Sequence, residues 1–528
     1  MREESDKLHH QGAGDQLEVI AYLSDARNFG ETGKVVRIDT HISHVFLAGE
    51  QAVKLKRAVK LDYVDFSTLE KRREACWTEL RLNRRTAPEI YLDVRSINRT
   101  GNGRIGFSEG EPVDWIVVMR RFDADGLLEA VAERGELTVA MVNQLADIVA
   151  DFHSKLKPLP VQDGQLKIDG VIAENRSCMI DHVPEIFTEQ EVEQLYKRSK
   201  QQLSEHALLL DRRARQGYVR HCHGDLHLAN ICLWKGAPTL FDCLEFNEEL
   251  ATIDTLYDLA FLLMDLWHRN LHVQANELFN RYLDMCNQAE GIAALPLFLS
   301  MRAVIRAHVA ANQAQLQNSQ RKRVALIGKA KAYAATALQF LQPSLPRLVA
   351  VGGLSGTGKS TLARAIASDF GTPVGARLLR TDVLRKRLFG VSPETRLDEQ
   401  AYSPEQGARV YALLVEEVET ALKCGWTVIA DGVFAAEAER RKIADVAERC
   451  GTPFTGIWLQ APPEKLLKRV DRRIGDASDA DSNVVKRQLD YEIGELDDWV
   501  AVDSSGGPDE VADTVRALLI NRASQSQS

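Results

Sequence analysis

The 528-residue chain lacks an excess of basic residues. Its 66 lysines and arginines are outnumbered by 75 aspartates and glutamates, for a formal net charge of −9. Proteins that bind nucleic acids or other polyanions in bulk carry a basic patch or balance. Local basic runs such as KLKRAVK (54–60) and RLNRR (81–85) therefore need an explanation other than general polyanion binding.

The sequence also lacks CxxC pairs, although it has eight cysteines. In a chain of this length, that pattern is typical of free thiols in a reducing compartment. The polar N-terminal segment has no apolar core of a secretory signal. The most apolar stretch, around 251–267, is interrupted by Asp254, Asp258 and Asp265, which argues against a membrane span there. We expect a cytoplasmic protein with no nucleic-acid or membrane partner.

One segment divides the chain. Two prolines in QPSLPR (342–347) separate a long helical region from a new apolar strand, as is typical of a domain boundary. The chain has no evident internal repeat. The sequence predicts one domain over 15–342 and a second over 346–523.

The first domain mixes strands and helices. Two β-rich runs joined by AGEQ within 35–62 predict a hairpin. STLEKRREACWTELRLNRRTA (67–87) predicts a helix, with Ser67 as the N-cap and Glu70 completing a capping box. WIVVMRRF (115–122) is strand-like, and most later runs of this domain have helical patterns. This order predicts an α+β domain.

The second domain alternates strand and helix patterns. The apolar runs RLVAVGG, ARLLRTD, TVIADGVF and FTGIWLQAP are each followed by a helical run. Such alternation predicts an α/β domain with a parallel sheet and helices on both faces.

A glycine-rich loop opens this second domain. The run GLSGTGKS follows an apolar strand and begins a helix, the context in which G-x-x-x-x-G-K-[ST] binds nucleotides. Its glycines let backbone N–H groups wrap phosphate oxygens at a helix N-terminus. Lys359 is then expected to reach the β- and γ-phosphates of ATP, and Ser360 to bind Mg²⁺. The predicted nucleotide-binding residues are Gly353, Leu354, Ser355, Gly356, Thr357, Gly358, Lys359, Ser360 and Thr361.

Two aspartates end strands of this sheet, where ligands bind in such folds. Asp382 ends ARLLRTD, and Asp431 ends TVIAD. Either could hold a Mg²⁺-bound water or take a proton from an acceptor hydroxyl, although Asp382 could instead be an N-cap. Arg385, close to Asp382 in the sequence, could hold an anionic or polar acceptor.

Three arginines precede an acidic loop further along the chain. LLKRVDRRIGDASDAD contains Arg469, Arg472 and Arg473, which could close over the phosphates or form a solvated helix face. Over 347–520 the sequence resembles the small P-loop kinases of the adenylate-kinase type, including gluconate kinase-like and zeta-toxin-like enzymes. The resemblance implies an α/β P-loop NTPase fold, an acceptor-facing Asp382, and lid arginines at Arg472 and Arg473. It does not identify the acceptor.

A second candidate site lies in HCHGDLHLANI (221–231), which is followed by FDCLEFN. Asp225, Asn230 and Asp242 supply, in order, a carboxylate to receive the acceptor proton and two Mg²⁺ ligands. The loop H-G-D-x-x-x-x-N resembles that of the aminoglycoside phosphotransferase and choline-kinase group of protein-kinase-like folds. The resemblance covers roughly 30–340.

In such a fold, a strand lysine should hold the α- and β-phosphates. Lys54 and Lys56 point to one face of their strand, so both are candidates; Lys54 is preferred because Ala-Val-Lys matches the kinase strand pattern. Glu79, or alternatively Glu74, is expected to pair with this lysine from the next helix. VVMRRF would be the hinge strand that receives adenine. The segment before the hairpin has no clear glycine-rich phosphate lid.

The histidines of the loop raise a zinc alternative. His221, His223 and His227 have short spacings that zinc sites can use, but typical structural zinc sites use cysteine pairs. We expect His223 to orient the loop instead. Asp254 and Asp258 are expected to cap a helix, with bracing of the loop as an alternative.

The sequence therefore predicts an ATP- and Mg²⁺-dependent kinase that phosphorylates a small hydroxyl-bearing metabolite and has two Mg-ATP sites. Two alternatives remain open. One is a ligand-regulated ATPase or signalling protein in which one domain is non-catalytic. The other is a zeta-toxin-like kinase of a sugar nucleotide, restrained by the first domain. The predicted metal ligands are Asn230, Asp242, Ser360 and Asp431.

Overall fold

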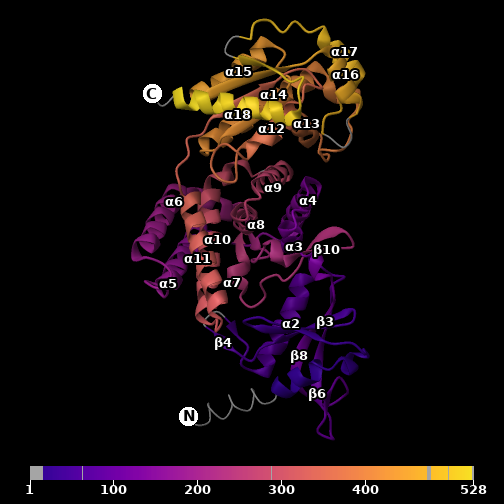
Figure 1. Ribbon diagram of the computed structural model, residues 1–528. Helices are drawn as coiled ribbons and strands as arrows, with labels where there is room; N and C mark the ends of the chain where they lie inside the picture. Colours follow the sequence, from indigo (N-terminus) through magenta and orange to yellow (C-terminus); the bar gives the residue numbers. More distant parts are fainter. Residues whose placement is uncertain (1–15, 62–63, 287, 473–476, 497–498, 526–528) are drawn as a thin grey trace. The chain divides into compact units, whose positions relative to one another are not determined.

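The computed structural model describes residues 16–61, 64–286, 288–472, 477–496 and 499–525, and Figure 1 shows its elements in sequence colours. The described chain forms two compact units. The first comprises Met1–Gln144, Asp151–Val161 and Gln216–Leu262, and the second comprises Leu145–Ala150, Gln162–Arg215 and Leu263–Ser528. The second unit thus joins several helices of the predicted first domain to the P-loop region. The predicted domain boundary near residue 345 stays a prediction.

A six-stranded antiparallel sheet dominates the first unit, in the order β1-β2-β3-β8-β6-β7. The predicted hairpin is confirmed, because β2 pairs with β3 and Ala48 lies opposite Gln51. Cys76 and Leu80 of helix α2 belong to one buried cluster with sheet residues such as Val117. The strands are β1 (Val36–Asp39), β2 (Ser43–Ala48), β3 (Gln51–Lys56), β6 (Tyr91–Arg99), β7 (Ile105–Gly106) and β8 (Glu111–Arg120).

Helix α2 spans Leu69–Asn83, and its start differs from the prediction. The N-cap is Thr68, whose side chain accepts a hydrogen bond from Lys71 N, so the predicted cap at Ser67 is wrong. Ser67 instead donates to Asp65 Oδ1 from both its backbone N–H and its hydroxyl. Because this local turn occupies Ser67, the helix begins one residue later.

Short elements complete the first unit and carry the loop between β9 and β10. β9 pairs with β12, and β10 pairs with β11, both antiparallel. Helices α4 and α8 contribute residues to both units. These elements are β4 (Lys60–Leu61), β5 (Val64–Asp65), α3 (Leu128–Glu133), α4 (Val139–Lys155), β9 (Val219–His221), β10 (Ile231–Trp234), β11 (Ala237–Leu240), α7 (Glu248–Ala251), β12 (Thr252–Asp254) and α8 (Thr255–His268).

Long helices form one part of the second unit, where α5 packs against α6 and α10 against α11. Within the described chain, the segment Ala289–Gln315 is long and apolar enough to cross a membrane, but 67% of its apolar window is buried. That burial is typical of a core helix in a soluble protein. The helices are α5 (Gly164–Ile180), α6 (Glu189–Arg215), α9 (His272–Met285), α10 (Leu295–Gln315) and α11 (Gln320–Phe340).

A five-stranded parallel sheet forms the P-loop region of the second unit, as predicted, in the order β14-β15-β13-β16-β17. Val349 of β13 and Ile457 of β16 share a buried core with α12 and α18, and α14 and α15 also pack against the strands. The strands are β13 (Leu348–Gly352), β14 (Arg377–Arg380), β15 (Val428–Asp431), β16 (Phe454–Gln460) and β17 (Trp499–Asp503). The helices are α12 (Lys359–Ala367), α13 (Thr381–Leu388), α14 (Pro404–Lys423), α15 (Glu437–Arg449), α16 (Pro463–Asp471), α17 (Ser482–Leu489) and α18 (Pro508–Gln525).

Helix α9 covers the open edge of this sheet at strand β14. Asn276, Asn280 and Asp284 recur every fourth residue and therefore share one helix face. Asn280 Oδ1 accepts from Leu378 N at 2.7 Å, and Asp284 Oδ1 lies 2.7 Å from Arg377 Nη2. Asn276 donates to two backbone oxygens just before the strand, at 2.9 and 3.0 Å. The two asparagines thus pair with backbone groups at the edge of the sheet, and Asp284 pairs with the Arg377 side chain.

Substituting Asn280→Ala should therefore destabilise the second unit. The buried N–H of Leu378 would lose its acceptor, which costs about 1–3 kcal/mol. The measurement is the shift in the urea midpoint of the full-length chain. Met285→Ala, an exposed change on the same helix, should alter stability by no more than about 0.5 kcal/mol. Equal shifts for the two variants would contradict this account of the edge.

Candidate active sites

The loop between β9 and β10 brings Asp225 and Asn230 together. It turns at Gly224, which has a left-handed φ of 82°. Asn230 Nδ2 donates to Asp225 Oδ2 at 2.8 Å and to the Asp225 backbone oxygen at 2.9 Å. The Asp225 side chain is 40% exposed. Its carboxylate is thus oriented by the asparagine and is partly exposed.

Asp258 braces this loop from the buried start of α8. Its Oδ2 accepts from His223 N at 3.1 Å, and its Oδ1 accepts from Gly224 N at 2.9 Å. The ring Nε2 of His153 lies 3.1 Å from the same Oδ2. Asp254, by contrast, accepts from a backbone N–H in the first turn of α8. The two expected aspartate roles are therefore divided: Asp254 caps the helix and Asp258 holds the loop.

The loop histidines are not gathered as metal ligands in the described part of the chain. There, the group of potential ligand atoms that lie within 4.8 Å of one another is His153, Cys222 and Asp258. Asp258 is already bonded to the loop, and Cys222 Sγ lies 3.5 Å from the backbone oxygen of Ile253. His223 Nε2 lies 3.0 Å from Phe241 O. It thereby connects the loop to the residue before Asp242, as expected of a residue that orients the loop.

Strand β3 directs Lys54 toward the predicted metal ligand. Lys54 Nζ lies 2.9 Å from Glu79 Oε1 and 2.6 Å from Asp242 Oδ1. Lys56 lies deeper: its side chain is fully buried and pairs with Glu79 Oε2 at 2.5 Å and with Glu245. Of the two strand lysines, Lys54 is therefore the one that contacts Asp242.

Opposite charges stabilise the ionised forms of Glu79 and Lys54. Burial alone would raise the pKa of Glu79, but Lys54 and Lys56 lower it to about 2. Burial alone would likewise lower the pKa of Lys54, yet Asp242 and Glu79 raise it well above its ordinary value. Glu74, the alternative partner, is exposed on α2. The acid that pairs with Lys54 is therefore Glu79.

In the second unit, strand β13 leads directly into the glycine-rich loop, and α12 begins at Lys359. Gly353 has a φ of 137°, and a Cβ there would lie 2.5 Å from Leu459 O. Gly356 has a φ of 84°, and a Cβ there would lie 2.6 Å from Leu466 O. Side chains at these two positions would collide with backbone atoms, so the loop conformation requires glycine.

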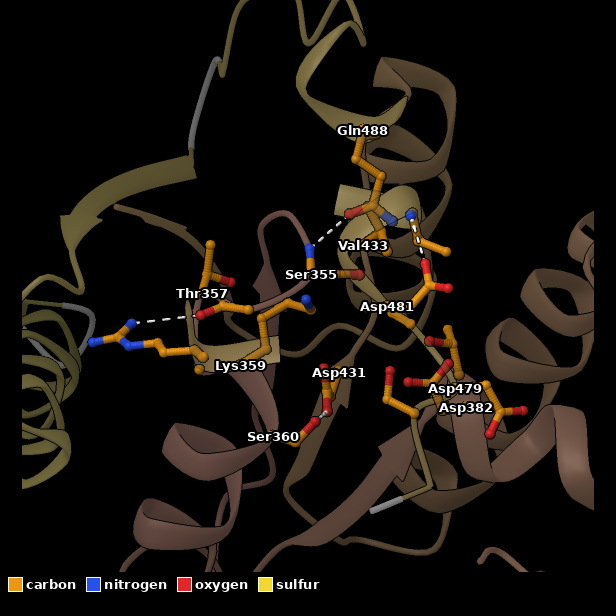
Figure 2. Close-up of a pocket in the computed structure, with 18 of the residues that line it drawn as sticks. Ser355, Thr357, Lys359, Ser360, Asp382, Asp431, Val433, Asp479, Asp481 and Gln488 are labelled. Carbon is orange, nitrogen blue, oxygen red and sulfur yellow. Dashed lines mark hydrogen bonds between the residues drawn. The ribbon is translucent and has the colours of Figure 1, made fainter. Parts of the chain in front are cut away.

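Ser360 and Asp431 meet at the base of this loop, as Figure 2 shows. The Ser360 hydroxyl donates to Asp431 Oδ2 at 2.5 Å, and Arg380 Nε lies 3.5 Å from the same oxygen. Lys359 Nζ donates to Leu354 O at 3.1 Å. Hydroxyl and carboxylate oxygens, such as those of Ser360 and Asp431, are the kind of ligand that Mg²⁺ prefers. The fold thus assembles the predicted metal pair from residues 71 positions apart.

Asp382 lies in the first turn of α13 and lines the same cavity, of about 1170 Å³, as Lys359 and Asp431. The N-cap of α13 is Arg380, so Asp382 does not cap this helix. Burial raises the pKa of Asp382, and Asp431 raises it further, against the opposing effect of Arg380. A carboxylate whose pKa is raised toward neutrality is a better proton acceptor.

Residues 478–481 line part of this cavity. Asp479 accepts hydrogen bonds from the side chains of Lys386 and Tyr402. On the following helix, Gln488 Oε1 accepts from Ser355 N at 2.7 Å (Figure 2). Neither Asp479 nor Gln488 was predicted from the sequence. Asp479 is 93 residues from its partner Lys386, and Gln488 is 133 residues from its partner Ser355, so no local spacing signals these pairs.

The predicted arginines lie in different places. Arg469 lines the cavity and donates to the backbone oxygen of Ser504 at 2.7 Å. Arg385 also lines the cavity. Arg472 is an exposed residue at the end of α16 and is not among the lining residues. Arg473 lies outside the described residues.

Comparison with known families matches two separate regions of the chain to two families. A model of the phosphotransferase enzyme family matches residues 116–295, and a model of an AAA domain matches residues 348–492. Together with the two folds, these matches define a two-domain protein: an aminoglycoside phosphotransferase-like region precedes a P-loop kinase-like region. Both kinds of kinase use ATP with Mg²⁺. The predicted fold classes are confirmed.

Whole-chain relatives place the protein more narrowly. An uncharacterized protein of Mycobacterium tuberculosis is 30% identical over 467 residues, which is 86% of this chain and 90% of the relative. A Mycobacterium bovis protein gives the same values. The chain belongs to the family of these mycobacterial proteins. An adenylyl-sulfate kinase of Myxococcus xanthus is 33% identical over 117 residues, 22% of this chain and 59% of the relative.

Solved structures resemble parts of the chain. A choline/ethanolamine kinase family protein from Mesorhizobium loti is 14% identical, with a TM-score of 0.39; the match covers 62% of this chain and 99% of that protein. A gluconokinase from Sinorhizobium meliloti is 21% identical, with a TM-score of 0.26; the match covers 35% of this chain and 97% of that protein.

Removal of the brace should loosen the loop of the first unit. In Asp258→Ala, the backbone N–H groups of His223 and Gly224 lose their acceptor, at about 1–3 kcal/mol for each buried group left unpaired. Hydrogen exchange of the loop amides and urea unfolding measure the loss. Asp151→Ala removes an exposed carboxylate from the same unit and should change stability by no more than about 0.5 kcal/mol. Unaltered loop exchange in Asp258→Ala would refute the bracing role.

Proposed function

We propose that the chain is an ATP-dependent kinase that phosphorylates hydroxyl groups of small molecules and holds one Mg-ATP in each region. The observation that carries the proposal is the Ser360–Asp431 pair, which lines one cavity together with Lys359 and Asp382. A metal-binding pair, a phosphate-binding cation and a candidate base thus surround one space. Phosphoryl transfer needs these groups, because positioning and charge neutralisation provide most of its catalysis.

In the P-loop region, backbone N–H groups of the glycine-rich loop and Lys359 would bind the phosphates of ATP. Ser360 and Asp431 would hold Mg²⁺, which neutralises phosphate charge when bound. Asp382 would accept the proton of the acceptor hydroxyl, whose oxygen attacks the γ-phosphorus while ADP leaves. Its raised pKa favours this proton transfer at neutral pH.

In the first region, Lys54 would bind the α- and β-phosphates, because Glu79 holds its ammonium group beside Asp242. Asn230 and Asp242 would hold Mg²⁺ through their side-chain oxygens. Asp225 would receive the proton of a second acceptor. The support for this assignment is the contact between Asn230 and Asp225, which orients the carboxylate before any ligand binds.

The two sites should be separable by substitution in the full-length chain. We expect Lys359→Ala and Asp225→Asn each to abolish a different set of products in a metabolite-library screen for ATP-dependent phosphorylation. Removal of a phosphate-binding group or a general base typically lowers rates by about 10²–10⁴-fold. A Lys359→Ala/Asp225→Asn double variant should lose both sets.

Lys468→Ala is the matched control, because Lys468 is exposed on α16 and does not line the cavity. Undiminished phosphorylation by the double variant would refute both sites. ATP hydrolysis without a phosphorylated acceptor would favour the alternative of a ligand-regulated ATPase.

Asp382→Asn should separate chemistry from nucleotide binding in the P-loop region. The amide cannot take the acceptor proton, so kcat should fall by about 10²–10⁴-fold, while the KM for ATP changes little. Steady-state kinetics with an acceptor found in the screen measures both constants. Asp398→Asn, an exposed change nearby, should leave both unchanged. A normal kcat for Asp382→Asn would assign the proton to another group.

A further inference from the structure

Each residue from Asp242 to Glu245 forms a hydrogen bond or an ion pair with a different element. Asp242 N donates to the Tyr91 hydroxyl of β6 at 3.2 Å, and Cys243 N donates to Asn83 Oδ1 of α2 at 2.8 Å. Leu244 N donates to the backbone oxygen of His223, in the loop between β9 and β10, at 2.9 Å. Glu245 pairs with Lys56 of β3. We call residues 242–245 the metal segment.

The last of these contacts is unlike the others, because it is a buried ion pair. The Lys56 side chain is 0% exposed and that of Glu245 is 4% exposed. Removing such charges from water costs several kcal/mol per ion, which attraction between them repays only with good geometry. Replacing a buried ion pair with apolar residues of similar size is often neutral or stabilising. The ionic pair is therefore better explained by the position it enforces than by the stability it adds.

The position it enforces is that of Asp242. This residue has a left-handed φ of 59°, a conformation that costs about 1–3 kcal/mol for a non-glycine residue unless its surroundings hold it. Its Oδ1 lies 2.6 Å from Lys54 Nζ. Lys54 and Lys56 share the Glu79 carboxylate, so the same network fixes β3 and both ends of the metal segment.

We propose that Lys56 and Glu245 are positioning residues of the first site, which hold Asp242 in place to bind Mg²⁺ beside Lys54 and do not themselves touch nucleotide. The proposal rests on the proposed Mg-ATP site of the first region. It gives a role to Lys56, whose full burial keeps it away from a phosphate. Partners that orient a metal ligand typically contribute 10–100-fold to metal affinity.

The test uses the full-length chain with Lys359→Ala, so that nucleotide binding reports the first site. Binding of a fluorescent ATP analogue is titrated with Mg²⁺. Adding Glu245→Gln should raise the Mg²⁺ concentration at half-saturation by about 10–100-fold and leave binding of the analogue without Mg²⁺ unchanged. A purely structural role would weaken both. Glu249→Gln, an exposed change four residues later, should alter neither.

Because Lys56→Met alone removes the lysine that pairs with the buried Glu245 carboxylate, the second variant is Lys56→Met/Glu245→Leu, which removes both charges of the pair. This variant should fold and show the same raised Mg²⁺ requirement. If it folds and keeps the parental Mg²⁺ dependence, the positioning role is overturned while the site stands. If the Lys359→Ala parent binds no Mg-ATP, the proposed first site fails, and the positioning role falls with it.

Discussion

The buried carboxylate of Glu79 binds two lysines at once, and the whole first site depends on that sharing. Lys54 extends from it toward Asp242, and Lys56 extends toward Glu245. A buried charge without a partner is costly, so the buried charges of Glu79, Lys54 and Lys56 stabilise one another. Strand β3, helix α2 and the metal segment are thereby joined without help from a nucleotide.

The second site presents mainly backbone groups to the negative charge of a bound phosphate. Gly353 and Gly356 allow the loop to turn close to neighbouring backbone, and the start of α12 presents N–H groups to an anion. A single carboxylate, that of Asp431, receives the Ser360 hydroxyl and lies near Arg380. The first site therefore depends on long-range ion pairs, whereas the second depends mainly on one contiguous loop.

Support for the second site extends beyond its own sheet. Asp382 follows strand β14, and the open edge of that strand is held by Asn280 and Asp284 of α9. Helix α9, which precedes the P-loop region, thus supports the strand that leads to the candidate base. This explains why the compact second unit includes this helix, although the prolines at 342–347 suggest a boundary. A proline-rich connection interrupts helices, but it does not prevent the flanking segments from packing together.

Local rules determined much of this protein from sequence alone. The P-loop needs only contiguous residues, so its place before α12 was predictable, and strand–helix alternation was sufficient to predict the parallel sheet. The order of Asp225, Asn230 and Asp242 likewise indicated a phosphoryl-transfer loop. The choice between Lys54 and Lys56 was different, because a period of two places both on one strand face. Only the packing of α2 and the metal segment distinguished Lys54, which contacts Asp242, from Lys56, which is fully buried and pairs with Glu245. Tertiary structure also decided the brace at Asp258 and the contacts of Asp479, because side chains far apart in sequence meet only when the elements that carry them have packed.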